Sequence, residues 1–358
     1  MQKKKKGLKI LLIIVAVLVI AVVAALIIGQ IDFRGPLAPP PEPTGTLTMP
    51  EGHIINVHEL RQAIVEEDDR LIIIGVINPT QELIPQSVAS RAIEGAYLVW
   101  RPDYSAGGSD AAISPNITGM RRSVAEMEEL LSRAGATAES KIVVYAADAM
   151  HDAARFVWQL RMLGHDNVWY LDGGMNAWLD ANFPFGNAVR LSDQPIRSQF
   201  RAPNYNPAAF DVSLAQVVEA LENPNQWVVI DTRAGDEFAG ERTGSSAGAF
   251  GTGRIAGTPH INWNRAVDPD TQLLRSRAEI EEIYGDVIQG KNVILFCQSG
   301  VRSAHTWLVL TEILGAQNVF NYEGSWIEWS YAASNFSDYP GERILELTEE
   351  WTDNNGAI

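Results

Sequence analysis

The longest apolar stretch of the chain lies near its N-terminus. Residues 10–28 are 19 consecutive apolar residues without a charge, a proline or a glycine. At about 1.5 Å per residue, a helix of this length can cross the hydrocarbon core of a bilayer. Five lysines lie within residues 1–9, whereas the charged residues that closely follow the run are Asp32 and Arg34. Because basic residues favour the cytoplasmic side, we predict a single-pass transmembrane helix with a cytoplasmic basic tail and the remaining chain outside the cytoplasm.

A cleaved signal peptide is the alternative interpretation of this apolar run. Its apolar core would be shorter, about 7–15 residues, and would end in a small-x-small cleavage site. An uncleaved anchor therefore fits the length better. Residues 29–53 follow with repeated prolines, as in the segment GPLAPPPEPTG. Because proline lacks a backbone donor and favours the extended polyproline II conformation, we predict a semi-rigid linker here.

The pattern of apolar strands and helices occurs twice in the rest of the chain. Residues 142–178 align with residues 293–329 at a constant offset of 151 without a gap. Each copy predicts a short apolar strand, a polar loop, a helix of apolar periodicity, a glycine stop and a second strand. Each also has an earlier apolar strand, at residues 70–75 and 227–231. A period this long indicates a duplicated domain, because solenoid repeats are only about 20–50 residues long.

The predicted fold is therefore α/β, with two tandem domains that each contain a parallel sheet flanked by helices. The predicted boundaries are residues 54–186 for the first domain and 209–345 for the second. A connector, residues 187–208, joins them, and residues 346–358 form an acidic C-terminal tail.

Composition and charge exclude several classes of protein. Hydrophobic residues make up 46% of the 358 residues and charged residues 20%, which is typical of a folded protein. A single cysteine excludes an intramolecular disulfide and a cysteine-cluster zinc site. Residues 10–358 carry 23 basic and 44 acidic side chains. Since this part would repel a phosphate backbone, we expect no nucleic-acid partner.

The single cysteine, Cys297, directly follows a predicted strand and opens a polar loop that leads into a helix. The loop and the start of this helix comprise Gln298, Ser299, Gly300, Val301, Arg302 and Ser303. The free amides at the start of the helix would stabilise a thiolate or a bound anion, and Arg302 adds a full positive charge. Gly300 permits a positive φ, which turns loop amides inward. The pattern predicts a nucleophilic thiolate with a lowered pKa, whereas a buried structural cysteine is the alternative.

These motifs together resemble a tandem-domain rhodanese of the thiosulfate or 3-mercaptopyruvate sulfurtransferase family. The resemblance rests on the loop CQSGVR at residues 297–302, on GRIAGT at 253–258, on YEGSWIEW at 322–329 and on the duplicated halves. It implies a catalytic cysteine in the second domain, whose loop holds a persulfide, and an inactive first domain. Ala146, which aligns with Cys297, fits that division.

The resemblance also implies the reaction and its partners. The Cys297 thiolate would take a sulfane sulfur from a small anionic donor such as thiosulfate, and a thiol or cyanide would remove it. No metal or organic cofactor is implied. Arg302 is predicted to orient the donor. A 3-mercaptopyruvate sulfurtransferase is one alternative, and a catalytically silent module that binds anions or partners is another. A cysteine phosphatase is disfavoured because it needs a longer loop than the four residues between Cys297 and Arg302.

Other residues near the predicted site have smaller predicted roles. Asp231 ends a strand and could anchor the active loop, and Arg233 follows it. Glu237 stands where many family members have an arginine, so the donor is the least certain part of the prediction. Trp326 could form a wall of the pocket, whereas Trp329 and His305 are predicted to pack in the core.

Overall fold

The computed structural model describes residues 49–66, 69–79, 91–107, 117–147, 150–187, 189–241, 248–335, 337 and 341–353. They belong to one compact unit, residues 42–358. Within the ranges just given, no helix is both long enough and apolar enough to cross a membrane. The predicted transmembrane helix, residues 10–28, lies outside the described residues, as do residues 29–48 of the predicted linker.

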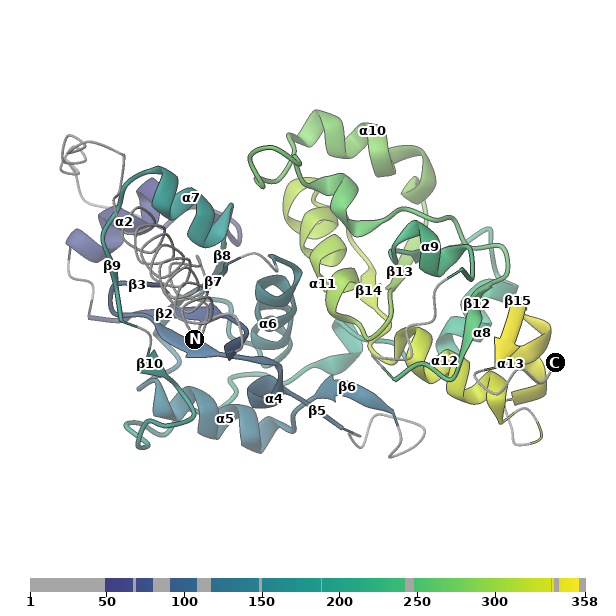
Figure 1. The fold of residues 1–358 in the computed structure, drawn as a ribbon, viewed down its shortest axis with the longest axis horizontal. Helices are drawn as coiled ribbons and strands as arrows, with labels where there is room; N and C mark the ends of the chain where they lie inside the picture. The colour runs from purple at the N-terminus through teal and green to yellow at the C-terminus, as the bar shows by residue number, and fades with distance from the viewer. Residues whose placement is uncertain are drawn as a thin grey trace, which may run out of the picture. The chain divides into compact units, whose positions relative to one another are not determined.

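The N-terminal half is built, in its described residues, on a six-stranded parallel sheet (Figure 1). The strands lie in the order β1 (Ile54–Ile55), β8 (Val168–Leu171), β7 (Lys141–Ala146), β2 (Leu71–Val76), β4 (Tyr97–Val99) and β10 (Val189–Arg190). The two central strands, β2 and β7, are apolar almost throughout, as expected for strands covered on both faces.

Alternate residues of these strands enter two separate cores. Ile72 and Ile74 pack with helices α5 (Val124–Arg133) and α6 (Met150–Met162). Ile73 lies in a second core with residues of α2 (Val57–Val65) and α7 (Gly174–Asp180). The sheet is therefore a middle layer between two layers of helices, which the period-two alternation of strand side chains requires.

The C-terminal half repeats the strand order of the N-terminal half. Its parallel sheet contains β11 (Trp227–Asp231), β13 (Asn292–Phe296) and β14 (Val319–Asn321), and β13 lies in the middle. Single parallel bridges, Asp211 to Asn321 and Asp231 to His260, continue it on both sides. At the offset of 151, β13 and β14 correspond to β7 and β8. The structure thus confirms the predicted duplicated α/β fold with parallel sheets.

The helices after the central strands also correspond. Helix α11 (Val301–Leu308), which continues as the π-helix η5 (Val309–Ile313), occupies the place of α6. Helix α12 (Ser325–Ser334) occupies the place of α7. The remaining elements are β3 (Ala92–Ile93), α4 (Arg101–Tyr104), β5 (Ser105–Gly107), β6 (Thr118–Arg121), β9 (Phe185–Gly186), η2 (Pro207–Ala209), α8 (Leu214–Glu222), α9 (Gly235–Phe238), β12 (Gly251–Ile255), η4 (Trp263–Ala266), α10 (Arg277–Ile288), α13 (Gly341–Glu346) and β15 (Thr348–Asp353).

Two antiparallel strand pairs among these elements are relevant to the site. Strands β5 and β6 form an antiparallel pair that follows α4 in the N-terminal half. In the C-terminal half, β12 pairs antiparallel with β15, which lies within the predicted acidic tail, residues 346–358. The beginning of that segment is therefore part of the folded C-terminal half.

The two halves share a core along α6 and α11, which lie side by side (Figure 1). The Trp158 indole donates a hydrogen bond to the carbonyl of Phe210 at 3.3 Å. The Phe210 ring in turn lies 5.6 Å from the Trp307 ring, measured between centroids. Because α11 begins directly after the cysteine loop, this packing brings side chains of the N-terminal half to the predicted site.

Candidate active site

Cys297 follows the last residue of β13, at the carboxyl edge of a parallel sheet, where α/β proteins commonly bind ligands. Its side chain is fully buried. Gly300 has φ of 73°, in the left-handed region that favours glycine. A Cβ atom at Gly300 would lie 2.8 Å from the carbonyl oxygen of Glu323. This close approach leaves no room for a side chain at that position of the loop.

The turn before α12 and its first residues hold the loop. The Cys297 amide donates to the Ser325 hydroxyl at 3.2 Å, and the Trp326 amide donates to the Cys297 carbonyl at 3.0 Å. The Ile327 amide donates to the carbonyl of Gln298 at 3.1 Å. Residues of the YEGSWIEW motif therefore hold the loop through hydrogen bonds, a role that was not predicted for Ser325.

The surroundings of the sulfur favour its thiolate form. Burial by itself raises the pKa of the Cys297 thiol. The positive charge of Arg302 and hydrogen bonds from the hydroxyl and amide of Ser303 and the amide of Ser299 outweigh burial, so the pKa is lower than usual. The Ser303 hydroxyl lies 3.5 Å from the sulfur. The loop thus has the electrostatics expected around a nucleophilic sulfur.

Arg302 is engaged by a carboxylate. Its two terminal nitrogens donate to the two carboxylate oxygens of Glu237, at 2.5 and 2.9 Å, in a bidentate ion pair. Glu237 is 4% exposed and lies on α9. Glu237 was noted in the sequence as a departure from the family pattern, and the structure shows that it holds the loop arginine. The positive charge of Arg302 can still stabilise the thiolate, but its two terminal nitrogens already bind Glu237.

Asp231 and Arg233 form a second buried ion pair, at 2.6 Å. The Arg233 guanidinium also stacks over the Trp326 ring, 4.4 Å from its centroid. Trp326 is 1% exposed and donates from its indole to the carbonyl of Gly251 at 3.0 Å. Arg233 also donates to the carbonyl of Gly253, at 3.1 Å. The three side chains therefore connect the end of β11, the start of α12 and β12, and their polar groups are engaged within the protein.

The two remaining residues of the sequence analysis lie in the core. Trp329 is fully buried, and its indole donates to the Thr348 hydroxyl at 2.9 Å. His305 is fully buried between the rings of Tyr170 and Trp263. Burial, together with the neighbouring His151, lowers the pKa of His305 to about 3, so this imidazole is neutral at physiological pH.

The N-terminal half contributes polar contacts that the sequence analysis missed. Arg155, on α6, donates to the Gly300 carbonyl at 3.4 Å and forms an ion pair with Glu323 in which both side chains are fully buried. Arg121, on β6, pairs with Glu323 and with Asp211. These contacts join residues far apart in the sequence. The one feature of the sequence that pointed to them was the position of Glu323 in the YEGSWIEW motif.

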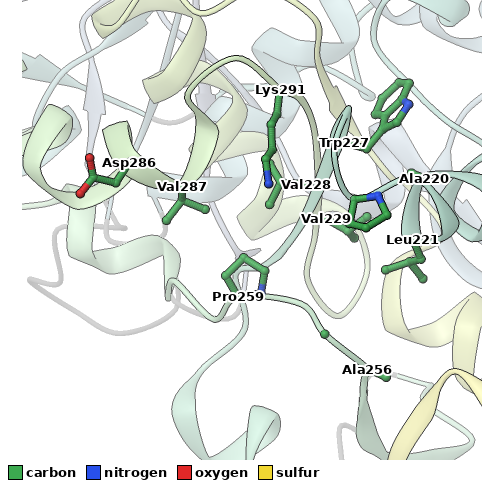
Figure 2. A pocket seen from close by; sticks show the side chains of 12 residues that line it. Ala220, Leu221, Trp227, Val228, Val229, Ala256, Pro259, Asp286, Val287 and Lys291 are labelled. Atoms are coloured by element: carbon green, nitrogen blue, oxygen red, sulfur yellow. The ribbon is translucent and has the colours of Figure 1, made fainter.

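The C-terminal half also contains a cavity that lies away from Cys297 (Figure 2). It has a volume of about 470 Å³, and Trp227 and Lys291 line it at the amino ends of β11 and β13. Cys297 lies at the opposite, carboxyl end of β13. None of the predicted site residues lines this cavity, so it is separate from the cysteine site.

Comparison with known proteins identifies the family. The model of the rhodanese-like domain matches residues 56–181 and 213–332. The chain belongs to the rhodanese family. Among its curated relatives, thiosulfate sulfurtransferase from Corynebacterium glutamicum is 32% identical over 213 residues, which cover 56% of this chain and 67% of the relative. A putative thiosulfate sulfurtransferase, SseA of Mycobacterium bovis, is 31% identical over 225 residues, which cover 58% and 69%.

Solved structures show the same rhodanese fold. SseA from Escherichia coli, described as a 3-mercaptopyruvate sulfotransferase, has a TM-score of 0.60 and 23% identity over 77% of this chain and 99% of that one. Tum1 from Saccharomyces cerevisiae has a TM-score of 0.67 and 20% identity, over 84% and 99%. The curated relatives confirm the predicted sulfurtransferase of the rhodanese type.

Proposed function

We propose that this protein transfers a sulfane sulfur from thiosulfate, or a similar anionic donor, to a thiol or cyanide through a persulfide on Cys297. The observation that carries the proposal is the buried Cys297 in a glycine-containing loop that lowers the pKa of its thiol. The names of the curated relatives support thiosulfate as the donor.

The proposed reaction has two steps. The Cys297 thiolate attacks the outer sulfur of thiosulfate, the sulfur–sulfur bond of the donor breaks, and sulfite leaves with the bonding electron pair. The enzyme then carries a persulfide whose negative outer sulfur faces the loop amides and the Ser303 hydroxyl. Cyanide attacks that outer sulfur, thiocyanate leaves, and the thiolate is restored.

Two other functions use the same loop. With 3-mercaptopyruvate as donor, the carbon–sulfur bond would break and pyruvate would leave as its enolate. A silent module would bind anions in the cradle without forming a bond to sulfur. The intact nucleophile and its lowered pKa favour catalysis over the silent module.

The test is intact-mass measurement of the purified protein after incubation with thiosulfate or with 3-mercaptopyruvate, before and after addition of cyanide. We expect thiosulfate to add one sulfur atom that cyanide removes, and Cys297→Ser to add none. Loading by 3-mercaptopyruvate alone would replace thiosulfate as the donor. A protein that takes sulfur from neither compound would support the silent module instead.

We also propose that residues 10–28 anchor the protein in a membrane, with both rhodanese domains outside the cytoplasm. The apolar length of this run and the five lysines before it support the proposal. Protease treatment of intact cells, after removal of the wall or outer membrane if present, should digest the domains. Domains cut only after the membrane is lysed would contradict the topology, and release by alkaline carbonate would contradict the anchor.

A further inference from the structure

Arg101 lies in the half that lacks the cysteine, and it combines an exposed side chain with a buried partner. It is the first residue of α4, in the segment between β4 and β5. Its side chain is 44% exposed, yet two of its nitrogens donate to the carboxylate of Asp152, at 2.7 and 2.9 Å. The Asp152 side chain is fully buried and also accepts from the Tyr104 hydroxyl at 3.0 Å. An exposed guanidinium is thus held in one orientation by a buried anchor.

The anchor lies beside the cysteine loop. Asp152 and Arg155 are three residues apart on α6 and therefore lie on the same side of that helix. Arg155 donates to the Gly300 carbonyl at 3.4 Å. The β5–β6 pair, which follows α4, also approaches the loop, because a Cβ atom at Gly119 would lie 3.1 Å from the Cβ of Ser299. Both the helix that anchors Arg101 and the strand pair that follows α4 therefore lie against the cysteine loop.

An anionic donor that approaches the sulfur would meet two arginine side chains. Two guanidinium groups, those of Arg101 and Arg302, interact electrostatically with Cys297. The Arg302 side chain is 19% exposed, and its two terminal nitrogens are bound to Glu237. The Arg101 side chain is more exposed, and its bonds to Asp152 use Nε and Nη2. Arginine has five N–H donors, so its Nη1 edge can bind another anion.

We infer that Arg101 binds the anionic end of the sulfur donor, so that the N-terminal half supplies the specificity for oxyanion donors while the C-terminal half supplies the nucleophile. The inference rests on the proposed sulfur transfer and names the part of the donor that is recognised. A thiolate that attacks a dianion such as thiosulfate faces charge repulsion, and Glu237 adds a further negative charge near the loop. A positioned guanidinium lowers that repulsion in the loading step.

The test separates the two half-reactions in the full-length protein. Arg101→Gln should lower kcat/KM for thiosulfate in the loading step by about tenfold to a hundredfold, the range expected for a charge-assisted hydrogen bond. Removal of the sulfur from the loaded enzyme by cyanide, which has no oxyanion group for Arg101 to bind, should change much less than loading. Arg101→Lys should recover part of the loading rate, because it keeps the charge.

Arg122→Gln is the matched control. Arg122, which directly follows β6, donates to the Pro102 carbonyl, in α4, at 2.7 Å and pairs with Glu126. The substitution removes the same charge and loosens α4, and it should leave loading unchanged. Equal loading by Arg101→Gln and the wild type, or equal losses in the two variants, would overturn the inference. A wild-type protein that takes sulfur from neither thiosulfate nor 3-mercaptopyruvate would refute the proposed function itself, and the inference with it.

Discussion

The ends of β7 and β13 occupy equivalent positions in the two halves, but their surroundings differ in almost every chemical respect. β7 ends at Ala146 and β13 leads into Cys297. Ser325, whose hydroxyl accepts from the Cys297 amide, corresponds to Gly174 in the N-terminal half. Both residues have φ near 50°, so the backbone turn is retained while the hydroxyl is absent. A Cβ atom at Gly174 would lie 2.3 Å from the Ala146 carbonyl.

The charges at the starts of α6 and α11 also differ. At the offset of 151, His151 stands at the place of Arg302 and Asp152 at the place of Ser303. A carboxylate at that position would oppose a neighbouring thiolate, whereas Ser303 stabilises one. In the N-terminal half, Asp152 instead holds Arg101, and Arg155 reaches the Gly300 carbonyl. At the described positions 146, 151 and 152, the N-terminal half thus has none of the cysteine, arginine and serine of the cradle, and residues of its corresponding helix contact the other half.

The strongest test of this comparison moves the cysteine from one half to the other. We expect the double variant Ala146→Cys, Cys297→Ala to take up no sulfur, because the N-terminal half has Gly174 in place of Ser325 and Asp152 in place of Ser303. Intact mass after thiosulfate treatment measures the result. The control is Ala146→Cys alone, which should gain one sulfur at Cys297. A cyanide-removable sulfur on the double variant, whose one thiol is at position 146, would contradict the prediction that the N-terminal half is inactive.

The support that the N-terminal half gives to the loop should be visible as stability. Arg155→Met leaves Glu323 buried with one of its two guanidinium partners missing. Breaking a buried ion pair costs about 3–5 kcal/mol, so we expect the free energy of unfolding to fall by about that amount. Urea unfolding followed by tryptophan fluorescence measures it. Sulfur loading should slow as well, since the Gly300 carbonyl loses a donor.

Arg161→Met is the control on the same helix. Arg161 pairs with Asp166, whose side chain is 77% exposed, and at 3.5 Å with Glu312, whose side chain is 13% exposed. The Arg161 side chain is itself 20% exposed, whereas Arg155 and Glu323 are both fully buried, so Arg161→Met should destabilise the protein much less than Arg155→Met. Equal losses in the two variants would mean that the buried pair has no special role between the halves.

The sequence was sufficient for the architecture and for the place of Cys297 between a strand and a helix. The offset of 151 predicted the paired strands and helices, and the residues after Cys297 predicted the loop, because both are local patterns of apolar and polar residues. The partners of the loop were harder to predict. Arg155 and Glu323 are 168 residues apart, and neither position has a local pattern that indicates its partner.

Glu237 is another residue whose partner could not be predicted from the sequence. Its departure from the family pattern was evident in the sequence, but its bidentate pairing with Arg302 depends on how α9 packs against the start of α11. The role first assigned to Arg302, to orient the donor, stays a prediction, and the bidentate pair shows which carboxylate a donor would meet beside it. The inferred role of Arg101 likewise depends on contacts between the halves.

The lowered pKa of Cys297 can be tested through its causes. Arg302→Gln removes the nearby positive charge, so the pKa should rise and less thiolate should exist at neutral pH. Glu237→Gln removes a nearby negative charge, so the pKa should fall. The ultraviolet absorbance of the thiolate, recorded against pH, reports Cys297 alone because the chain has one cysteine. A midpoint that moves in the same direction in both variants would show that loop geometry, and not charge, sets the pKa.

The smallest expected effect concerns the Ser303 hydroxyl, which Asp152 replaces in the N-terminal half. Ser303→Ala removes the hydrogen bond to the sulfur, so the pKa of Cys297 should rise and loading by thiosulfate at neutral pH should slow about twofold to tenfold, as expected for one hydrogen bond. Ser132→Ala is the control, since Ser132 is a buried serine of the N-terminal half that binds backbone groups. It should lose stability without a change in loading. An unchanged rate in Ser303→Ala would mean that the hydroxyl does not act on the sulfur, and the inactivity of the N-terminal half would then depend on Ala146, Gly174 and the charge of Asp152.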